Sequence, residues 1–358
     1  MGSLRLMAWF AAIVPASLLG LNAHAQELSK VTIAQQHAVV SVGEEVFFYA
    51  VPKRLGYFRE EGLDVVLQSV ANAGVAAQGL QNGAAEFATT QPEAIMKLRE
   101  QGGDLIGIYA LRHGNGSKVA ILPESPIAQL EDMKGKTIGG LSWGAGGAPV
   151  LMRMLSDAGI DADSYRRVTV GAGPAALTAL MNKQIDALVL WDSIFASFEN
   201  GGAKLRYVEM PIQRKMGALT IATTERFAKQ NPSKVEGFCR AVSKGLHFTR
   251  TNIAAAIRIF LDEFPSLKTP GVEASKLVAN GVHILDTWLN AALWDVPYGE
   301  PTGTIPPGTW KFSQDFYVAA KSLQGTASSE DAYTNRYIAA CNQFDRAAVA
   351  AEAKRYPN

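Results

Sequence analysis

The chain is poor in the residues that build metal and thiol chemistry. It has two cysteines and five histidines among 358 residues, and none of them stands at the spacing typical of zinc ligands. Ser142 also lacks the surrounding G-x-S-x-G pattern of a serine hydrolase. The sequence therefore predicts no bound metal, no cofactor and no catalytic centre.

An excess of charge of one sign is lacking as well. Lysine and arginine number 34 and aspartate and glutamate 33, which gives a formal net charge of +1. The two signs are interspersed along the chain, without the basic stripe that a nucleic-acid surface requires. We therefore expect no nucleic acid among the partners.

Only one long hydrophobic run is present. It extends from Leu6 to Leu21, follows Arg5, and ends before Ala23-His24-Ala25. The run is short for a membrane span, and the small residues after it form a cleavage site. We expect residues 1–25 to be a signal peptide, removed after Ala25, and the mature protein to be periplasmic, without a lipid anchor.

The two cysteines, Cys239 and Cys341, both fall in helical patterns near the C-terminus. In an oxidising compartment they could form one disulfide. Two buried free thiols agree with the sequence equally well, so both alternatives stay open.

What the chain does have is an internal repeat. Ala73-Gly74-x-Ala76-Ala77 returns about a hundred residues later as Ala172-Gly173-x-Ala175-Ala176, and Leu80-x-Asn82-x-x-x-Glu86 returns as Leu180-x-Asn182-x-x-x-Asp186. Such a period is too long for a solenoid or propeller. It indicates two α/β lobes built alike, with a cleft between them.

Strands and helices alternate up to about residue 224, and helical patterns dominate after Pro232. This order is typical of parallel sheets covered by helices. We expect residues 26–115 and 213–358 to form the first lobe with its C-terminal helices, and residues 116–212 to form the second lobe. Two chain crossings would then make a hinge.

Ligands of open α/β sheets bind beyond the carboxyl ends of the strands. The repeat pairs Gln91 with Trp191 at such ends, and the loops Gln35–Gly43 and Ser142–Ala148 follow the first strand of each lobe. Glu86 and Asp186 instead precede strands. We therefore assign them to turns at the opposite edge.

The second of these loops is rich in glycine, with Gly144, Gly146 and Gly147 before a helix expected after Pro149. Backbone N–H groups at a helix start favour a negatively charged group. An ordinary strand-to-helix turn would also explain the glycines. The candidate ligand-binding residues are Gln35, His37, Phe47, Gln91, Ser142, Trp143, Gly144, Gly146, Gly147, Trp191 and Asp192.

Some of these assignments have competing interpretations. Phe47 belongs to the run Phe47-Phe48-Tyr49 near the start of a helix expected over Glu45–Leu55, and part of that run must be core. Asp192 could meet a ligand amine, but capping of the following helix is the stronger expectation. His37 contacts ligand or is a solvated loop residue.

Four segments resemble the periplasmic solute-binding proteins of ABC importers for nitrate, sulfonates, taurine and a thiamine pyrimidine precursor. They are residues 55–65 (LGYFREEGLDV), 130–139 (LEDMKGKTIG), 176–180 (ALTAL) and 185–187 (IDA). The resemblance implies a bilobed type II periplasmic-binding-protein fold, a monomer that delivers a small molecule to a membrane permease, and no catalysis.

The chain departs from that pattern at Trp191-Asp192, where many relatives carry a proline, and its 143–148 loop lacks hydroxyl residues. We therefore expect an organic ligand with an apolar body, carrying an anionic or polar group or a heterocycle, rather than an inorganic anion. The alternatives are a pyrimidine-synthase-like enzyme of the same fold and a ligand-sensing domain for a partner receptor.

Overall fold

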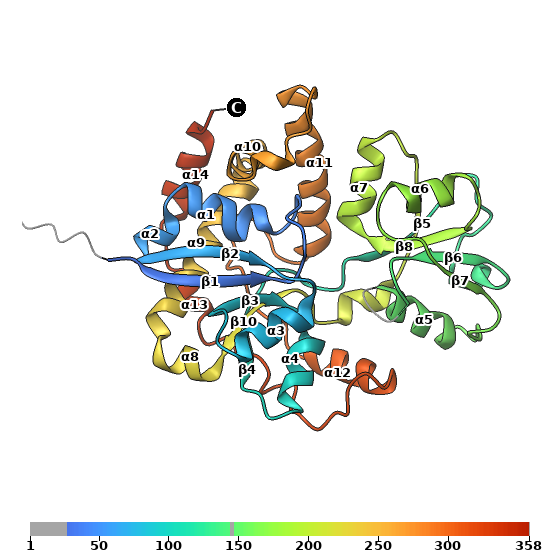
Figure 1. Cartoon of the computed structure of the whole chain (residues 1–358), viewed down its shortest axis with the longest axis horizontal. Helices are drawn as coiled ribbons and strands as arrows, with labels where there is room; N and C mark the ends of the chain where they lie inside the picture. The colour runs from blue at the N-terminus through green and yellow to red at the C-terminus, as the bar shows by residue number, and fades with distance from the viewer. Residues whose placement is uncertain (1–26, 144–146, 358) are drawn as a thin grey trace, which may run out of the picture.

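The computed structural model describes residues 27–143 and 147–357. Two five-stranded mixed sheets organise the chain, one in each lobe (Figure 1). The strand orders are β2-β1-β3-β10-β4 and β7-β6-β8-β5-β9. In the first sheet, β10 runs antiparallel to both of its neighbours, β3 and β4. In the second sheet, β5 runs antiparallel to β8 and β9.

The first sheet consists of β1 (Ser29–Gln35), β2 (Leu63–Ser69), β3 (Phe87–Thr90), β4 (Leu105–Ala110) and β10 (Thr220–Thr224). Its strands alternate between two cores, as the period of two requires. Val31 and Ile33 face the larger core, whereas Ala34 packs into the smaller core on the other face. Both faces are therefore buried.

The second sheet consists of β5 (Ser117–Ile121), β6 (Thr137–Gly140), β7 (Arg166–Thr169), β8 (Ala187–Trp191) and β9 (Arg206–Val208). Val119 and Ile121 face one core and Ala120 the other. The chain reaches this sheet through residues 111–116 and leaves it through residues 209–219, so two segments connect the lobes (Figure 1).

Helices cover both faces of each sheet. In the first lobe they include α3 (Ala73–Gln81), α4 (Pro92–Arg99), α9 (Pro232–Thr251), α10 (Ile253–Glu263), α11 (Ala274–Ala292), α12 (Thr309–Ala319) and α14 (Arg346–Arg355), with the shorter α1 (Val51–Arg54), α2 (Tyr57–Glu60), α8 (Glu225–Gln230) and α13 (Ile338–Cys341). The second lobe carries α5 (Gly147–Asp157), α6 (Pro174–Met181) and α7 (Asp192–Asn200). Short 3₁₀ segments η2 (Leu130–Met133), η3 (Pro211–Lys215) and η4 (Pro265–Leu267) complete the connections.

The helix expected over Glu45–Leu55 is not uniform. Its first part is a π-helix, η1 (Val46–Ala50), which continues into α1 at Val51. All five residues of η1 are buried, as are the first two of α1. π-helices are rare and occur mostly as single-turn bulges within α-helices, which is the form this segment takes.

The internal repeat is reproduced at the amino ends of the strands. The Glu86 carboxylate accepts the N–H of Thr32 at 2.7 Å, and the Asp186 carboxylate accepts the N–H of Thr137 at 2.8 Å. In each lobe the carboxylate ties the start of one strand to its parallel neighbour. The prediction that these two residues precede strands, at the edge opposite the carboxyl ends, is confirmed.

The repeat also explains an unusual backbone conformation. Asn82-Gly83 and Asn182-Lys183 end equivalent helices, with φ of 73° at Gly83 and 56° at Lys183. For a residue with a Cβ this left-handed conformation costs free energy, whereas glycine adopts it freely. Lys183 is held there because the repeated architecture requires the turn.

Cys239 and Cys341 form a disulfide across 102 residues of sequence. The bond joins α9 to the end of α13, and both sulfurs lie in the buried core of the first lobe. Of the two alternatives for the cysteines, the disulfide is therefore the correct one. Among the described residues, no helix has the length and apolar character needed to cross a lipid bilayer.

We predict that Lys183→Gly stabilises the second lobe by about 1 kcal/mol, because glycine relieves the left-handed strain. The ion pair between Lys183 and Glu124 is exposed and spans 3.4 Å, so its loss costs little. Urea unfolding measures the difference. Gly83→Lys, the reverse exchange in the first lobe, should destabilise, and a stabilising effect there would contradict the explanation.

We predict that Cys239→Ala combined with Cys341→Ala lowers the free energy of unfolding by about 2–4 kcal/mol, because a long loop is no longer closed in the unfolded chain. Thermal unfolding with and without reductant measures this. Reductant should lower the melting temperature of the wild type only. Equal melting temperatures of variant and oxidised wild type would refute it.

Candidate functional site

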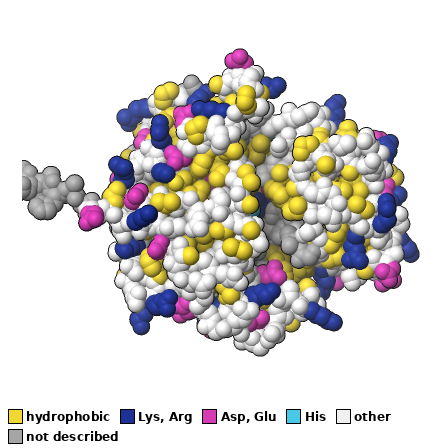
Figure 2. All heavy atoms as spheres, viewed as in Figure 1, with side chains coloured by type: hydrophobic (Ala, Val, Ile, Leu, Met, Phe, Trp, Pro, Cys, Tyr) yellow, Lys and Arg dark blue, Asp and Glu magenta, His cyan; other side chains and the backbone are white. Residues whose placement is uncertain are grey.

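A groove separates the two lobes, and hydrophobic side chains lie along its walls in the space-filling view (Figure 2). The carboxyl ends of β1 and β3 in the first sheet, and of β6 and β8 in the second, carry the residues that the sequence selected. Ligands of open α/β sheets bind at such ends. We therefore take these four strand ends, with the loops that follow them, as the candidate site.

Gln35 ends β1 and has no exposed surface. Its Nε2 donates to Ser69 Oγ at 2.8 Å and to the His37 carbonyl at 3.3 Å, while its Oε1 has no partner. The next residue, Gln36, is 8% exposed, and its Oε1 is unpaired too. The Gln36 N–H donates to Thr89 Oγ1, which fixes this loop on β3.

His37 lies half exposed, with Nε2 3.2 Å from the buried Glu44 carboxylate. Burial lowers the pKa of His37, but the hydrogen bond and the attraction of Glu44 raise it, so that the net shift is upward. For Glu44, burial raises the pKa, whereas His37 and the charge of Arg112 bring it below its usual value. His37 and Glu44 therefore form an ion pair in the first lobe.

Glu45 is different from its neighbour because no cation pairs with it among the described residues. Its side chain is 1% exposed and Oε1 has no hydrogen-bond partner. Burial and the adjacent Glu44 charge raise the pKa of Glu45 well above its usual value. A carboxyl group in this position is stabilised when a donor reaches it.

The two other predicted residues of the first lobe, Phe47 and Gln91, differ in their surroundings. Phe47 has no exposed surface and packs on Trp288, with ring centroids 5.3 Å apart. We leave it out of the proposed ligand contacts, because its ring fills the core. Gln91 precedes α4 at the end of β3 and is half buried, without a side-chain cap to the helix.

In the second lobe, Ser142 and Trp143 follow β6 and are both half buried. The Trp143 ring packs against the second-lobe core, and its Nε1 is buried without a partner. A buried indole N–H normally finds an acceptor. Gly144 and Gly146 lie outside the described residues.

The helix expected after Pro149 begins earlier, because α5 starts at Gly147. A Cβ on Gly147 would come within 2.2 Å of Ser117 Oγ on β5. The absence of a side chain therefore lets the helix start pack tightly on the neighbouring strand. Packing alone is a sufficient reason for this glycine, and Pro149 falls within the first turn.

Trp191 ends β8 and keeps 37% of its surface exposed, the larger exposure of the two tryptophans at the strand ends. Asp192 after it is 1% exposed and forms an ion pair with Arg112. Its other oxygen accepts the N–H of Ser193 at 2.8 Å. The expectation that Asp192 caps the helix is wrong, because Asp192 is the first residue of α7 and the capping position belongs to Trp191, which makes no side-chain cap. The Asp192 carboxylate instead holds an arginine that the sequence did not select.

Arg112 connects the lobes. It belongs to the first crossing segment, is 7% exposed, and its guanidinium lies 5.2 Å from the Trp288 ring centroid in α11. Together with Asp192 it joins the first lobe to the start of α7. A second contact between α7 and α11 adds to this: His283 Nδ1 lies 2.8 Å from Asn200 Oδ1.

Sequence reasoning missed Arg112, Gln36, Glu44 and Glu45. A usable pattern existed for the carboxylates, since Glu44-Glu45 stands directly before the apolar run from Val46 to Val51. Glutamate is almost never fully buried unless it is paired, so two glutamates beside a buried helix indicate an unusual environment. Nothing comparable marks Arg112, whose partner lies 80 residues away.

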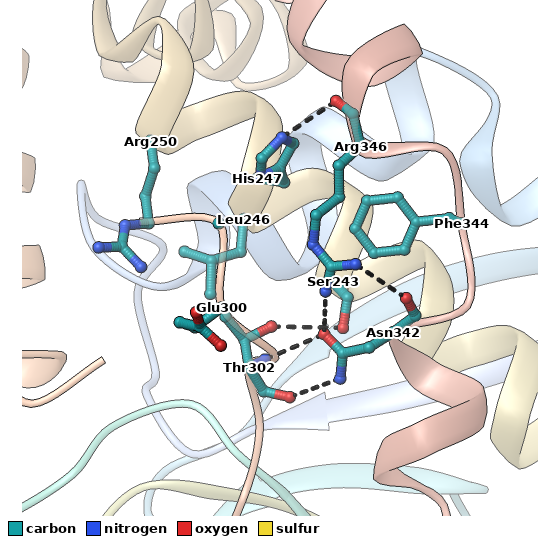
Figure 3. A pocket seen from close by; sticks show the side chains of 10 residues that line it. Ser243, Leu246, His247, Arg250, Glu300, Thr302, Asn342, Phe344 and Arg346 are labelled. Carbon is teal, nitrogen blue, oxygen red and sulfur yellow. Dashed lines mark hydrogen bonds between the residues drawn. The ribbon is translucent and has the colours of Figure 1, made fainter. Parts of the chain in front are cut away.

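A further pocket lies within the first lobe, between α9, the 299–302 loop and the region after α13 (Figure 3). Its polar side chains bond one another: Arg346 donates to Asn342 Oδ1 at 3.1 Å, and Asn342 donates to the Thr302 carbonyl at 2.9 Å. Groups that are already satisfied gain little from a ligand. Within residues 27–143 and 147–357, no group of His, Cys, Asp and Glu side chains is arranged to hold a metal ion.

Several solved structures share this fold. The periplasmic aliphatic sulphonate binding protein SsuA from Escherichia coli has a TM-score of 0.63 at 15% identity, covering 85% of this chain and 91% of its own. The periplasmic nitrate-binding protein NrtA from Synechocystis PCC 6803 has a TM-score of 0.55 at 11% identity, covering 92% and 90%. The architecture is therefore that of the bilobed periplasmic binding proteins.

Among sequence relatives, the riboflavin-binding protein RibY from Chloroflexus aurantiacus is 24% identical over 87% of this chain and 86% of its own length. A 4-amino-5-hydroxymethyl-2-methylpyrimidine phosphate synthase from Legionella pneumophila is 21% identical over 62% and 70%. A family model described as NMT1/THI5 like matches residues 45–256. The chain belongs to the NMT1/THI5 like family.

Proposed function

We propose that the protein is the extracytoplasmic solute-binding component of an ABC importer. It captures a small organic molecule in the groove between the lobes and delivers it to a membrane permease. The observation that carries the proposal is the set of buried, unpaired polar atoms at the facing strand ends, with Gln35, Gln36 and Glu45 on one lobe and Trp143 on the other. A ligand would satisfy them.

The described groups favour an organic ligand with a planar body over a small inorganic anion. Trp143 and Trp191 offer flat apolar faces at neighbouring strand ends of the second lobe. The buried cation near the groove, Arg112, is already neutralised by Asp192. The relatives RibY and the pyrimidine phosphate synthase are named for planar heterocycles, which supports this choice.

The proposal includes the expected cellular location and oligomeric state of the protein. Removal of residues 1–25 would release a periplasmic monomer, which then meets the permease. Intact mass of the exported protein tests the cleavage after Ala25.

An enzyme of the pyrimidine-synthase type is the second candidate, because such proteins are among the sequence relatives. The two cysteines of this chain are bonded to each other in the core of the first lobe, away from the strand ends. A thiol is thus not supplied to the groove by either residue. Turnover of a bound molecule in the purified protein would favour the enzyme over the binding protein.

We predict that native mass spectrometry of the exported protein finds a co-purified small molecule, and that its return to stripped protein quenches tryptophan fluorescence and compacts the protein in X-ray scattering. Trp191→Ala should weaken binding at least tenfold, or about 1.4 kcal/mol, because Trp191 is the exposed ring at the groove. Tyr298→Ala, which removes an exposed aromatic ring of the first lobe that stacks on His247 in α9, is the matched control. Normal binding by Trp191→Ala would exclude this groove as the site.

We predict that Arg112→Ala and Asp192→Ala each destabilise the protein by about 3–5 kcal/mol, because each leaves a buried charge unpaired. The double variant should lose less than the sum of the two. Urea unfolding of the three variants gives the coupling energy, and X-ray scattering reports whether the lobes separate. Strictly additive losses would show that the pair does not connect the lobes.

A further inference from the structure

Two of the connections between the lobes contain a histidine whose ring nitrogens both face hydrogen-bond acceptors. His113 lies in the first crossing segment, and His283 lies in α11, against α7 of the second lobe. A neutral imidazole has one donor and one acceptor nitrogen, whereas the doubly protonated ring has two donors. A ring placed between two acceptors is therefore matched to its surroundings only in the charged form.

His113 is buried at the chain crossing, with 9% of its side chain exposed. Its Nδ1 lies 2.7 Å from an Asp295 carboxylate oxygen, and its Nε2 lies 2.9 Å from the Thr304 carbonyl oxygen. A carbonyl oxygen and an ionised carboxylate can only accept. Both contacts are therefore hydrogen bonds when the ring carries two protons. Loss of one proton turns a nitrogen lone pair toward an oxygen, and such an unmatched pair is costly inside a protein.

The loop that holds His113 also contacts the second crossing segment. Trp294, the residue before Asp295, has its ring centroid 5.0 Å from the guanidinium of Arg214 in that segment. The two crossing segments also bond each other through their backbones. A change at His113 therefore reaches both segments that connect the lobes.

The second histidine belongs to the contact between α7 and α11, which lie side by side (Figure 1). Asn200 Nδ2 donates to the Asn280 carbonyl at 3.0 Å, which turns Asn200 Oδ1 toward His283 Nδ1 at 2.8 Å. His283 Nε2 lies 3.6 Å from the Glu199 carboxylate. With one proton, on Nδ1, the ring presents a lone pair to this carboxylate. With two protons it forms an ion pair between the lobes.

We propose that the lobes are held together by proton-dependent contacts, in which the imidazolium forms of His113 and His283 maintain the described arrangement and their deprotonation loosens it. The inference goes beyond solute capture, because it concerns the protein without ligand. Contacts that require the protonated ring are present at low pH and are lost as the pH rises through the range in which histidines titrate, about pH 5 to 8. Separation of the lobes should therefore increase with pH.

The charged groups that face His113 come from three segments. Asp295 is its partner, and Arg214 lies beyond Trp294 on the second crossing segment. Among the described residues that line the cavity beside His113, the other ionisable side chain is Arg112, which is paired with Asp192. The charge nearest to the ring that still lacks a second partner is thus the Asp295 carboxylate, and it favours the charged imidazole.

His283 faces fewer charges. Glu199 reaches it from α7, and Asp286 follows it by one turn on α11. Helix α10 packs on the other side of α11, at Gly281, where a Cβ would meet Ile257. Both acidic groups favour the protonated ring, so His283 should respond to pH in the same direction as His113.

The test measures lobe separation in the full exported protein, stripped of ligand, by X-ray scattering at several values between about pH 5 and pH 8. We expect the radius of gyration to increase with pH. His113→Gln and His283→Gln should each weaken this dependence, and the double variant should remove it, because glutamine does not titrate. His247→Gln is the matched control, since His247 Nε2 bonds the Arg346 carbonyl within the first lobe. It should keep the dependence of the wild type.

A second measurement covers the case in which His113→Gln fails to fold. NMR of the ring nitrogens in isotope-labelled wild type should show two protons on His113 at the acidic end of the range. Asp295→Asn and Glu199→Gln keep an acceptor oxygen and remove the charge at side chains that are 33% and 28% exposed. Each should lower the protonated fraction of its own histidine and leave the other unchanged.

A radius of gyration that does not change with pH would overturn the inference. A singly protonated His113 across the whole range, or full pH dependence in the double variant, would do so as well. These outcomes leave the solute-binding function intact, because the co-purified molecule and Trp191→Ala test it separately.

Discussion

The ion pair between Arg112 and Asp192 is the contact on which the relation between the lobes depends. Arg112 lies in one of the two crossing segments, and Asp192 opens the helix that follows the central strand of the second sheet. Both charges are buried, so neither can lose its partner without a large desolvation cost. The same arginine lies over Trp288 and acts on Glu44. One side chain thus joins the first crossing segment, helix α11 and Glu44 of the candidate site.

Most of the fold could be predicted because its determinants are local and repeated. The strand Leu105–Ala110 follows from a short apolar run bounded by turn residues, and the internal repeat predicts the second lobe from the first. The family resemblance supplied the bilobed arrangement. The π-helical form of residues 46–50 could not be read from sequence, because it depends on the enclosure of that segment by distant helices. The disulfide stayed undecided for the same reason, since a sequence does not give the distance between two cysteines.

The position of the candidate site follows from the sequence more directly than its chemistry does. The rule that ligands bind at the carboxyl ends of strands selects Gln35, Trp143 and Trp191 from the sequence alone. The glycine-rich loop suggested a helix start that holds an anion, whereas Gly147 has a sufficient reason in its contact with Ser117. The sequence does not single out the acidic pair Glu44-Glu45, because the pair is unusual only in that one oxygen of the Glu45 carboxyl group lacks a hydrogen-bond partner. A missing partner becomes visible only when burial and hydrogen bonds are known.

The order of the strands also has a consequence for how the chain is made. The second sheet uses one continuous stretch, from β5 at Ser117 to β9 at Val208, and all its strands are present once that stretch has emerged. The first sheet is complete only after β10, near its centre, has been made. Its disulfide and the helices that cover it are complete only after Cys341, close to the C-terminus, has been made. Contacts that span so much sequence form late. The second sheet can therefore pair all its strands while the first lobe still exposes the apolar faces of β3 and β4, which makes the unfinished first lobe the part of the molecule most open to aggregation. The core of the second lobe is completed later, when Phe316 of α12 packs into it.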